Sequence, residues 1–143
     1  MLLSACSNNQ NVLIYCTAME ITQPISITVK TAYLDDQSQP ELKRFVFAYT
    51  ITIANTGDIP TQLLKRHWII TDANNVQQEV LGDGVVGEKP HIAPGGHYTY
   101  TSGIVLETEV GTMEGYYQMQ TDDGSRFDAP IPTFALTHPK SLH

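Results

Sequence analysis

The chain has 143 residues, of which 41% are hydrophobic and 16% are charged, and its net charge at pH 7 is −7. This length fits one domain that buries a sizeable core without disulfides or metals. The negative charge argues against a general nucleic-acid binder and against docking on anionic lipid, because both functions use basic surfaces. No apolar run approaches the roughly 20 residues that a membrane-spanning helix needs.

Both cysteines, Cys6 and Cys16, lie within residues 1–18. The rest of the chain therefore has no disulfide framework, and a reducing cytoplasm is the expected compartment. The residues before Cys6 resemble a lipoprotein cleavage site, but the basic region and the apolar region of about 7–15 residues that a signal needs are missing. We expect residues 1–18 to be a disordered leader from an over-extended start, with Met19 opening a single domain over residues 19–143.

Hydrophobic and polar residues alternate with period two along most of the chain, which is typical of half-buried strands. Strands separated by turn residues are expected at 25–33, 45–53, 62–71, 76–81, 97–103, 115–121, 125–128 and 130–136,. Prolines place the last strand near a sheet edge. No stretch has the pattern of a ten-residue amphipathic helix. The sequence therefore predicts an all-β fold, an antiparallel β-sandwich of immunoglobulin-like or fibronectin type III-like kind with seven to eight strands.

Three glycines within residues 82–89 have the G-x-G-x-x-G spacing of a pyrophosphate-binding loop,. The helix that such a loop needs does not follow, because Pro90 and Pro94 break it. Two interpretations stay open. Either the loop N–H groups form an anion-binding nest with help from His91 and a charged lysine, or the glycines serve a tight crossover loop that needs positive φ. The candidate anion-site residues are Gly82, Gly84, Val85, Gly87 and Lys89.

The run Arg66-His67-Trp68 is the second candidate site. On an ideal strand Trp68 shares a face with Leu64 and Arg66, and a core position is the simplest interpretation for a central tryptophan of a sandwich. His67 lies on the other face with Leu63. It is a candidate ligand or base, with a structural histidine as the alternative.

Metal binding and catalysis have little support in the sequence. The histidines show no i, i+2 or i, i+4 pair, and Asp122-Asp123-Gly124 is interpreted as a hairpin turn rather than a calcium loop. There is no G-x-S-x-G elbow and no cysteine nucleophile after residue 18,. The carboxylates considered are scattered over turns and loops: Asp72, Asp83, Glu88 and Glu107. We expect no metal site, no cofactor and no catalytic residues.

Four tyrosines form the last constellation. Tyr98 and Tyr100 share a strand face, whereas the adjacent Tyr116 and Tyr117 point to opposite faces. An outward tyrosine is a common anchor for a partner. Cross-strand packing or a tyrosine corner is the alternative.

Several motifs together resemble the bacterial ApaG family. They are residues 66–72, 79–80, 82–88, 94–95, 98–103 and 113–115, and the resemblance covers about residues 20–143. It implies a fibronectin type III-like sandwich. Related domains occur in eukaryotic F-box proteins and in a polymerase delta-interacting protein, so the resemblance implies that this chain is an interaction module. The bacterial members of the family are associated with cobalt resistance and magnesium efflux. The resemblance therefore implies the same association here, and a nucleotide or pyrophosphate connection through the glycine loop.

These observations favour a non-catalytic module that binds a protein partner and, at the glycine loop, a phosphate-bearing ligand. Two alternatives stay open. One is an enzyme or enzyme accessory acting on phosphorylated nucleotides, and the other is a factor in divalent-cation homeostasis. Sandwich edges also make a homodimer plausible.

Overall fold

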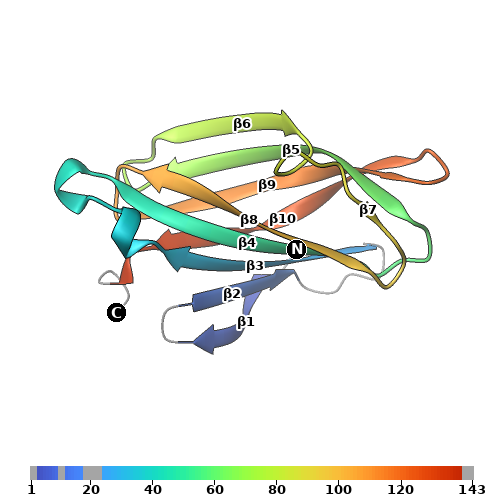
Figure 1. Cartoon of the computed structure of the whole chain (residues 1–143), viewed down its shortest axis with the longest axis horizontal. Helices are drawn as coiled ribbons and strands as arrows, with labels where there is room; N and C mark the ends of the chain where they lie inside the picture. Colours follow the sequence, from blue (N-terminus) through green and yellow to red (C-terminus); the bar gives the residue numbers. More distant parts are fainter. Residues whose placement is uncertain (1–2, 10–11, 18–23, 140–143) are drawn as a thin grey trace.

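The computed structural model describes residues 3–9, 12–17 and 24–139, and strands dominate this part of the chain (Figure 1). The elements in chain order are β1 (Leu3–Asn9), β2 (Val12–Thr17), β3 (Ile25–Tyr33), two short 3-10 helices (Asp35–Gln37 and Pro40–Leu42), β4 (Phe45–Asn55), β5 (Thr61–Asp72), β6 (Gln77–Asp83), β7 (His91–Ile92), β8 (His97–Leu106), β9 (Val110–Thr121) and β10 (Arg126–Thr137).

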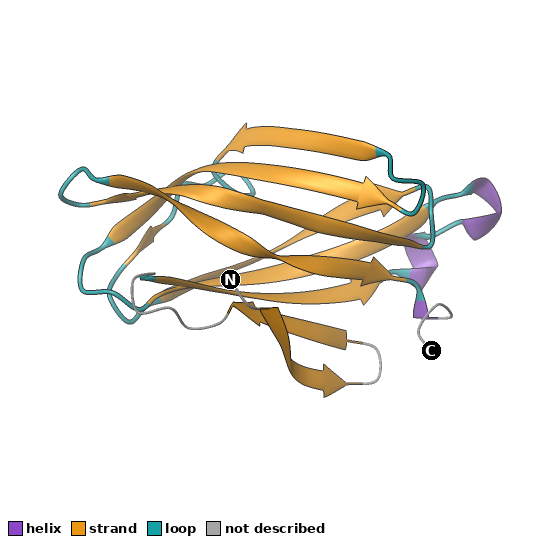
Figure 2. Cartoon of the chain, turned by 180° about the vertical axis from the view of Figure 1, so that it is seen from behind, coloured by secondary structure: helices purple, strands orange, loops and turns teal. Residues whose placement is uncertain are grey.

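Two antiparallel sheets pack face to face as a sandwich (Figures 1 and 2). The first sheet has the order β1-β2-β3-β4-β8. The second has the order β10-β9-β5-β6, with β7 beside β5. The predicted antiparallel β-sandwich is therefore confirmed. The two predicted C-terminal strands are a single strand, β10, and it forms a sheet edge as its prolines indicated,.

Two strands lie within the expected leader, in residues 3–9 and 12–17. β1 and β2 form an antiparallel hairpin, and β2 pairs with β3 from Leu13 to Cys16. Residues 12–16 are mostly apolar or β-branched, so they extend the sheet at the edge of β3,. The predicted start at Met19 lies outside the described residues.

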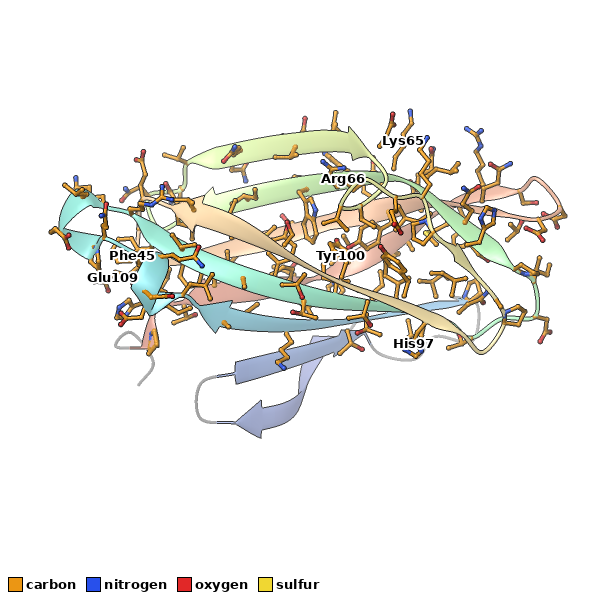
Figure 3. The ribbon with its side chains drawn as sticks, viewed as in Figure 1. Phe45, Lys65, Arg66, His97, Tyr100 and Glu109 are labelled. Atoms are coloured by element: carbon orange, nitrogen blue, oxygen red, sulfur yellow. The ribbon has the colours of Figure 1, made fainter. Side chains whose placement is uncertain are left out.

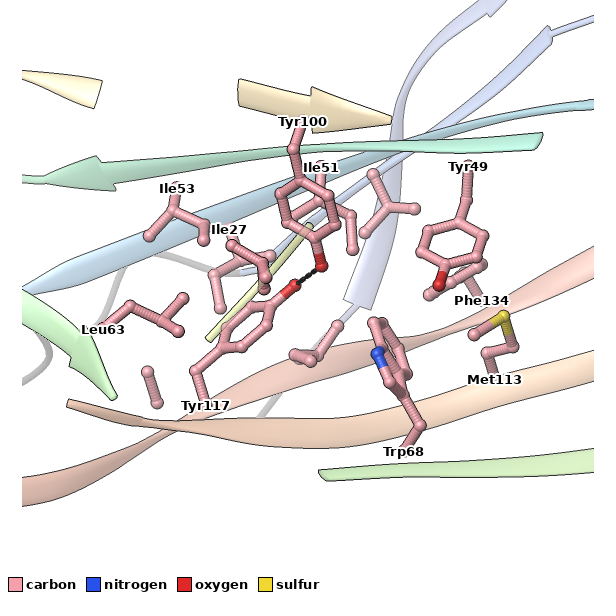
Figure 4. Packing of buried hydrophobic residues seen from close by; sticks show 14 of the residues in the cluster. Ile27, Tyr49, Ile51, Ile53, Leu63, Trp68, Tyr100, Met113, Tyr117 and Phe134 are labelled. Carbon is pink, nitrogen blue, oxygen red and sulfur yellow. Dashed lines mark hydrogen bonds between the residues drawn. The ribbon is translucent and has the colours of Figure 1, made fainter. Parts of the chain in front are cut away.

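The core between the sheets is rich in aromatic rings (Figure 4). Trp68 is 3% exposed and packs edge-on against Tyr49 and Phe134, with ring centroids 5.5 and 5.9 Å apart. Such edge-to-face pairs contribute about 0.5–1.5 kcal/mol each beyond the burial of their area. The prediction that Trp68 is a core residue is confirmed.

Strand β5 departs from ideal alternation at Leu64. A bulge between Leu63 and Lys65 places one extra residue opposite β9. Leu63 and Trp68 are consequently both buried, although ideal alternation placed them on opposite faces,. That part of the prediction is wrong, because a period-two pattern does not contain the extra residue. Beyond the bulge, Arg66 and Trp68 lie on the inner face, as predicted.

Candidate functional site

The glycine run folds as a tight hairpin, named here the glycine hairpin (residues 82–89). The N–H of Val85 donates to the carbonyl of Glu88 at 2.8 Å, and the N–H of Glu88 donates back at 2.9 Å. The two residues between them, Val86 and Gly87, have φ of 41° and 81°. This is the positive-φ geometry that two-residue hairpin turns favour, and it is unusual for a β-branched valine.

Gly84 is the residue that this hairpin needs most. Its φ is 63°, and a Cβ there would lie 2.2 Å from the carbonyl oxygen of Glu88. Its N–H donates to the carbonyl of Leu64 at 2.8 Å. Three loop amides, those of Gly84, Val85 and Glu88, are thus occupied within the protein. At the tip, the amides of Val86 and Gly87 have no backbone acceptor among the described residues.

The structure separates the five predicted anion-site residues. Val85 is buried at 1% exposure, Gly87 lies at the exposed tip, and both line one cleft. Gly82 lies in β6 beneath Arg66, and the exposed Lys89 is not among the residues that line the cleft. The carbonyl of Lys89 instead accepts a hydrogen bond from Gln62 at 3.1 Å.

Arg66 is the cation at this place, and sequence reasoning missed it. Its Nη1 donates to the carbonyls of Asp83 at 3.0 Å and Gly84 at 2.9 Å, which fixes the guanidinium against the base of the hairpin (Figure 3). A Cβ on Gly82 would lie 2.6 Å from the guanidinium carbon, so Gly82 makes room for it. A guanidinium has five N–H donors, so Nη2 and Nε remain available. No carboxylate in the described ranges lies within ion-pair distance of Arg66.

Beside Arg66 a cleft of about 300 Å³ opens between the sheets, at the flank bounded by β6 and β8. We name it the Arg66 cleft. Its walls include Tyr49, Trp68, Val85, Gly87, Tyr100 and Ser102. The indole N–H of Trp68 and the hydroxyls of Tyr49 and Ser102 have no hydrogen-bond partner within the described segments. The cleft therefore combines one half-buried cation, aromatic walls and several unused donors with one exposed carboxylate, that of Asp83. The cation and the donors are the groups that receive an oxyanion.

The hydroxyls of Tyr100 and Tyr117 are hydrogen-bonded to each other next to the cleft (Figure 4). Burial raises the pKa of Tyr100 well above its usual value, and the bond from Tyr117 and the charge of Arg66 oppose this only in part. Burial also raises the pKa of Tyr117, and its neighbour Tyr100 adds to the rise. Both phenols are therefore neutral near pH 7, and neither serves as a base.

His67 lies on the opposite, outer face of the same sheet. A groove of about 370 Å³ there is lined by residues that include Lys65, Arg66, His67, Asp83 and Tyr116, so Arg66 and Asp83 border both this groove and the cleft. The Nε2 of His67 lies 2.9 Å from Oε2 of Glu79, and its ring packs edge-on against Tyr116 at 4.8 Å. Its Nδ1 is buried and has no partner in the part of the chain that the structure describes. Tyr116 thus points outward and Tyr117 inward, as predicted. The histidine is tied to its neighbours and does not reach the Arg66 cleft.

The other candidate groups do not converge. Within the part of the chain that the structure describes, no three His, Cys, Asp or Glu side chains gather as a metal site. The run Asp122 to Gly124 forms the hairpin turn between β9 and β10, with Gly124 at φ 91°. His143 lies outside the described residues. No helix within the described segments is long and apolar enough to cross a membrane.

Comparison with known proteins gives concordant matches. The family model described as the ApaG domain matches residues 35–121. Protein ApaG of Pseudomonas aeruginosa (strain LESB58) is 59% identical over 119 residues, covering 83% of this chain and 94% of the relative. Protein ApaG of Thiobacillus denitrificans is 57% identical over the same shares. A crystal structure of a Bordetella pertussis protein provisionally named ApaA superposes with a TM-score of 0.80 at 45% identity, covering 82% of this chain and 98% of that one.

Proposed function

The chain belongs to the ApaG domain family, and from that premise we propose that it is a non-catalytic protein-interaction module. Its Arg66 cleft receives an oxyanion carried by a partner protein, either a carboxylate or a phosphate group. The observation that carries this proposal is a half-buried guanidinium, held by two backbone carbonyls, that has no carboxylate partner in the described residues and borders a cleft.

Burying the charge of Arg66 carries a free-energy cost. A cation removed from water without a counter-ion is unfavourable unless its donors are satisfied. In Arg66 only Nη1 has acceptors among the described residues, and these are neutral carbonyls. A partner oxyanion would supply the missing charge and accept from the remaining donors. Such charge-assisted hydrogen bonds are worth about 1.5–3 kcal/mol each.

A non-catalytic role is favoured by what lines the cleft. A reacting centre needs a base or nucleophile with a suitable pKa beside its oxyanion donors. Among the described residues around the cleft, the ionisable groups are Arg66, Asp83 and neutral tyrosines, with no histidine, lysine or cysteine. The single carboxylate of this set, Asp83, is exposed, so the set binds and orients an anion without a buried base beside it.

A phosphate-bearing ligand at the glycine hairpin remains part of this proposal, but the residues have other roles than the sequence predicted. Gly87 contributes to the wall and its free amide lies at the tip, while Gly82 makes room for the arginine. The positive charge comes from Arg66 rather than from Lys89. Binding through an arginine fork also fits a planar carboxylate or a phosphate better than a point charge does.

The test is an NMR titration of the full chain with four probes: a capped glutamyl peptide, a capped phosphoseryl peptide, inorganic pyrophosphate and ADP. We expect one of the two peptides to shift the Trp68 indole, the Arg66 Nε and the Gly87 amide in a dose-dependent way. Arg66→Gln should weaken that binding about tenfold or more, since a lost charge-assisted bond exceeds about 1.4 kcal/mol. Arg126→Gln, which makes the same charge change on β10, should leave it unchanged.

Two outcomes would overturn the proposal. If no probe moves these signals, the cleft is not an anion site. If ADP or pyrophosphate binds and both peptides fail, the alternative of a protein acting on phosphorylated nucleotides is favoured instead.

A further inference from the structure

The two sheets end unequally on the flank that holds the Arg66 cleft. Among the described strands, β8 is the last strand of the first sheet and pairs only with β4, whereas β6 is the last strand of the second sheet and pairs only with β5. On the opposite flank the hairpin β1–β2 continues the first sheet beyond β3 (Figure 2). The first sheet is thus extended on one side and left with an open edge, β8, on the other.

The register shows which backbone groups of β8 face this open edge. The N–H of Asn55 donates to the carbonyl of Gly96 at 3.0 Å, and Ala54 is paired with His97. In an antiparallel pair, hydrogen-bonded and non-hydrogen-bonded residues alternate. The even-numbered residues of β8 therefore bond to β4, and the N–H and C=O groups that point to the open edge belong to Thr99, Thr101, Gly103 and Val105.

Side-chain contacts support this assignment. The hydroxyls of Thr50 and Thr101 lie 2.8 Å apart, and those of Thr52 and Thr99 lie 3.0 Å apart. Cross-strand side chains approach most closely at the non-hydrogen-bonded pairs, which is where the assignment places both of these pairs.

The open edge lacks the features that usually block further pairing. Natural edge strands carry charges, prolines or bulges that prevent another strand from adding. From His97 to Leu106 there is no aspartate, glutamate, lysine, arginine or proline, and β8 pairs with β4 over ten residues without a register shift. The facing edge strand β6, in contrast, carries the carboxylates of Glu79 and Asp83.

A second cleft lies farther along the same flank. It has a volume of about 230 Å³ and is lined by Ile70, Asp72, Val76, Gln78, Leu106 and Glu107. We name it the Ile70 cleft. Its aliphatic walls and two carboxylates match a lysine or arginine side chain, whose stem is apolar and whose tip is positive. Valines 76, 86 and 105, which are 62%, 57% and 43% exposed, also border these two clefts.

We propose that β8 accepts an extended segment of a partner protein as an added strand, and that alternate side chains of that strand enter the two clefts. This rests on the proposed function, because one of those side chains is the acidic group that Arg66 binds. The Arg66 cleft meets β8 at Tyr100 and Ser102, and the Ile70 cleft meets it at Val105 and Leu106. Ser102 and Leu106, which share the inner face of β8, are four residues apart. Four residues of strand span about 13 Å, and residues four apart share a face.

The partner segment is therefore defined by its chemistry. It is extended, with an acidic or phosphorylated residue and a lysine or arginine four positions apart, and with no proline between them. Main-chain hydrogen bonds to Thr99, Thr101, Gly103 and Val105 supply affinity, and the two charged side chains supply specificity. This division of roles is usual when a peptide is added to a sheet edge.

The test uses the full chain and two capped nine-residue peptides with threonine at most positions. One has glutamate third and lysine seventh, and the other has these two exchanged, because the direction of the added strand decides which one fits. We expect one peptide to bind and to slow amide hydrogen exchange at Thr99, Thr101, Gly103 and Val105. Methylating the peptide amides that face β8 should weaken binding at least tenfold, whereas methylating the alternate amides should not. These controls leave the protein fold untouched.

Protein variants separate the two clefts. Glu107→Gln should weaken the lysine peptide severalfold but not a peptide with norleucine in that place. If the peptide binds with protection on β8 but Arg66→Gln has no effect, strand addition holds and the anion site fails. If small anions bind in an Arg66-dependent way but both methylation patterns act alike, strand addition is refuted. It is equally refuted if the chain alone dimerises with these amides protected, since a second copy would then occupy the edge.

Discussion

The hydroxyl pair of Tyr100 and Tyr117 allows a sharp test of how the core meets the cleft. Tyr117 is 0% exposed, whereas Tyr100 is 7% exposed and lines the Arg66 cleft. Tyr100→Phe removes the hydrogen-bond partner of Tyr117 and leaves a hydroxyl fully buried. An unsatisfied buried group costs about 1–3 kcal/mol, and we expect the upper half of that range. Tyr117→Phe leaves the hydroxyl of Tyr100, a residue that lines the cleft; we expect water there to replace the lost partner, so that only the net bond of about 0.5–1.5 kcal/mol is lost,.

The double variant should cost less than the sum of the two single variants. Replacing both partners removes the bond without leaving an unsatisfied group, which is close to neutral. We expect a coupling free energy of about 1–2 kcal/mol. Urea unfolding at pH 7 measures it, with circular dichroism as the signal and unchanged m values as the control for two-state behaviour. Equal costs for the two single variants, or a double variant that is additive, would refute the proposed difference in water access.

Three further predictions follow from the same region. Because burial raises the pKa of Tyr100 and Tyr117 above 10.0, the folded protein holds protons that the unfolded chain releases above that pH. The free energy of unfolding should thus be insensitive to these groups below pH 10 and fall above it by about 1.4 kcal/mol per pH unit for each tyrosine, and urea titrations of the double phenylalanine variant should show a flatter profile. Gly84→Ala should destabilise the fold by at least about 3 kcal/mol because positive φ and a clash add, whereas Gly87→Ala, with φ of 81° and nothing within 4 Å, should cost only about 1 kcal/mol in thermal unfolding,. Gly82→Ala should displace the Arg66 guanidinium and weaken anion binding severalfold, with a small change in melting temperature. Unchanged binding would show that the guanidinium does not need the space that Gly82 leaves.

The alternation of hydrophobic and polar residues predicted most of the strands, because each strand buries one of its two faces. β4 shows why this works: the structure buries its large residues at the odd positions from Phe45 to Ile53, although it also buries Val46 and Asn55. Pattern reasoning failed where a residue is added without a change of composition. The bulge at Leu64 shifts Leu63 onto the buried face, and nothing in the local sequence marks the extra residue. The pairing of β2 with β3 was not predicted because residues 1–18 resemble a leader, and the continuous apolar run of β2 lacks the period-two pattern of a half-buried strand,.

The candidate site shows a different limit. The G-x-G-x-x-G spacing predicts an anion site at the glycines. Spacing does not show which backbone amides already have a hydrogen-bond acceptor, and three amides of the glycine hairpin do. The contact between Arg66 and the carbonyls of Asp83 and Gly84 joins residues 17 and 18 positions apart, so it depends on the pairing of β5 with β6. One signal was present in the sequence. An arginine predicted to share a face with a core tryptophan must either be paired or border a cavity, because an unpaired buried charge is too costly.

The glycine hairpin and Arg66 therefore form one structural unit rather than two separate candidate sites. Gly84 has the positive φ that turns the chain, and its carbonyl and that of Asp83 then point at the guanidinium. Gly82 leaves the volume in which that guanidinium lies. The glycines thus position the cation Arg66 at the open flank. The sequence motif alone would suggest instead that the glycines bind the anion themselves. Substitutions at Gly84 disturb the fold and the site together, so the role of the hairpin in binding is separable only at Gly82 and Arg66, where the backbone conformation does not depend on the residue that is changed.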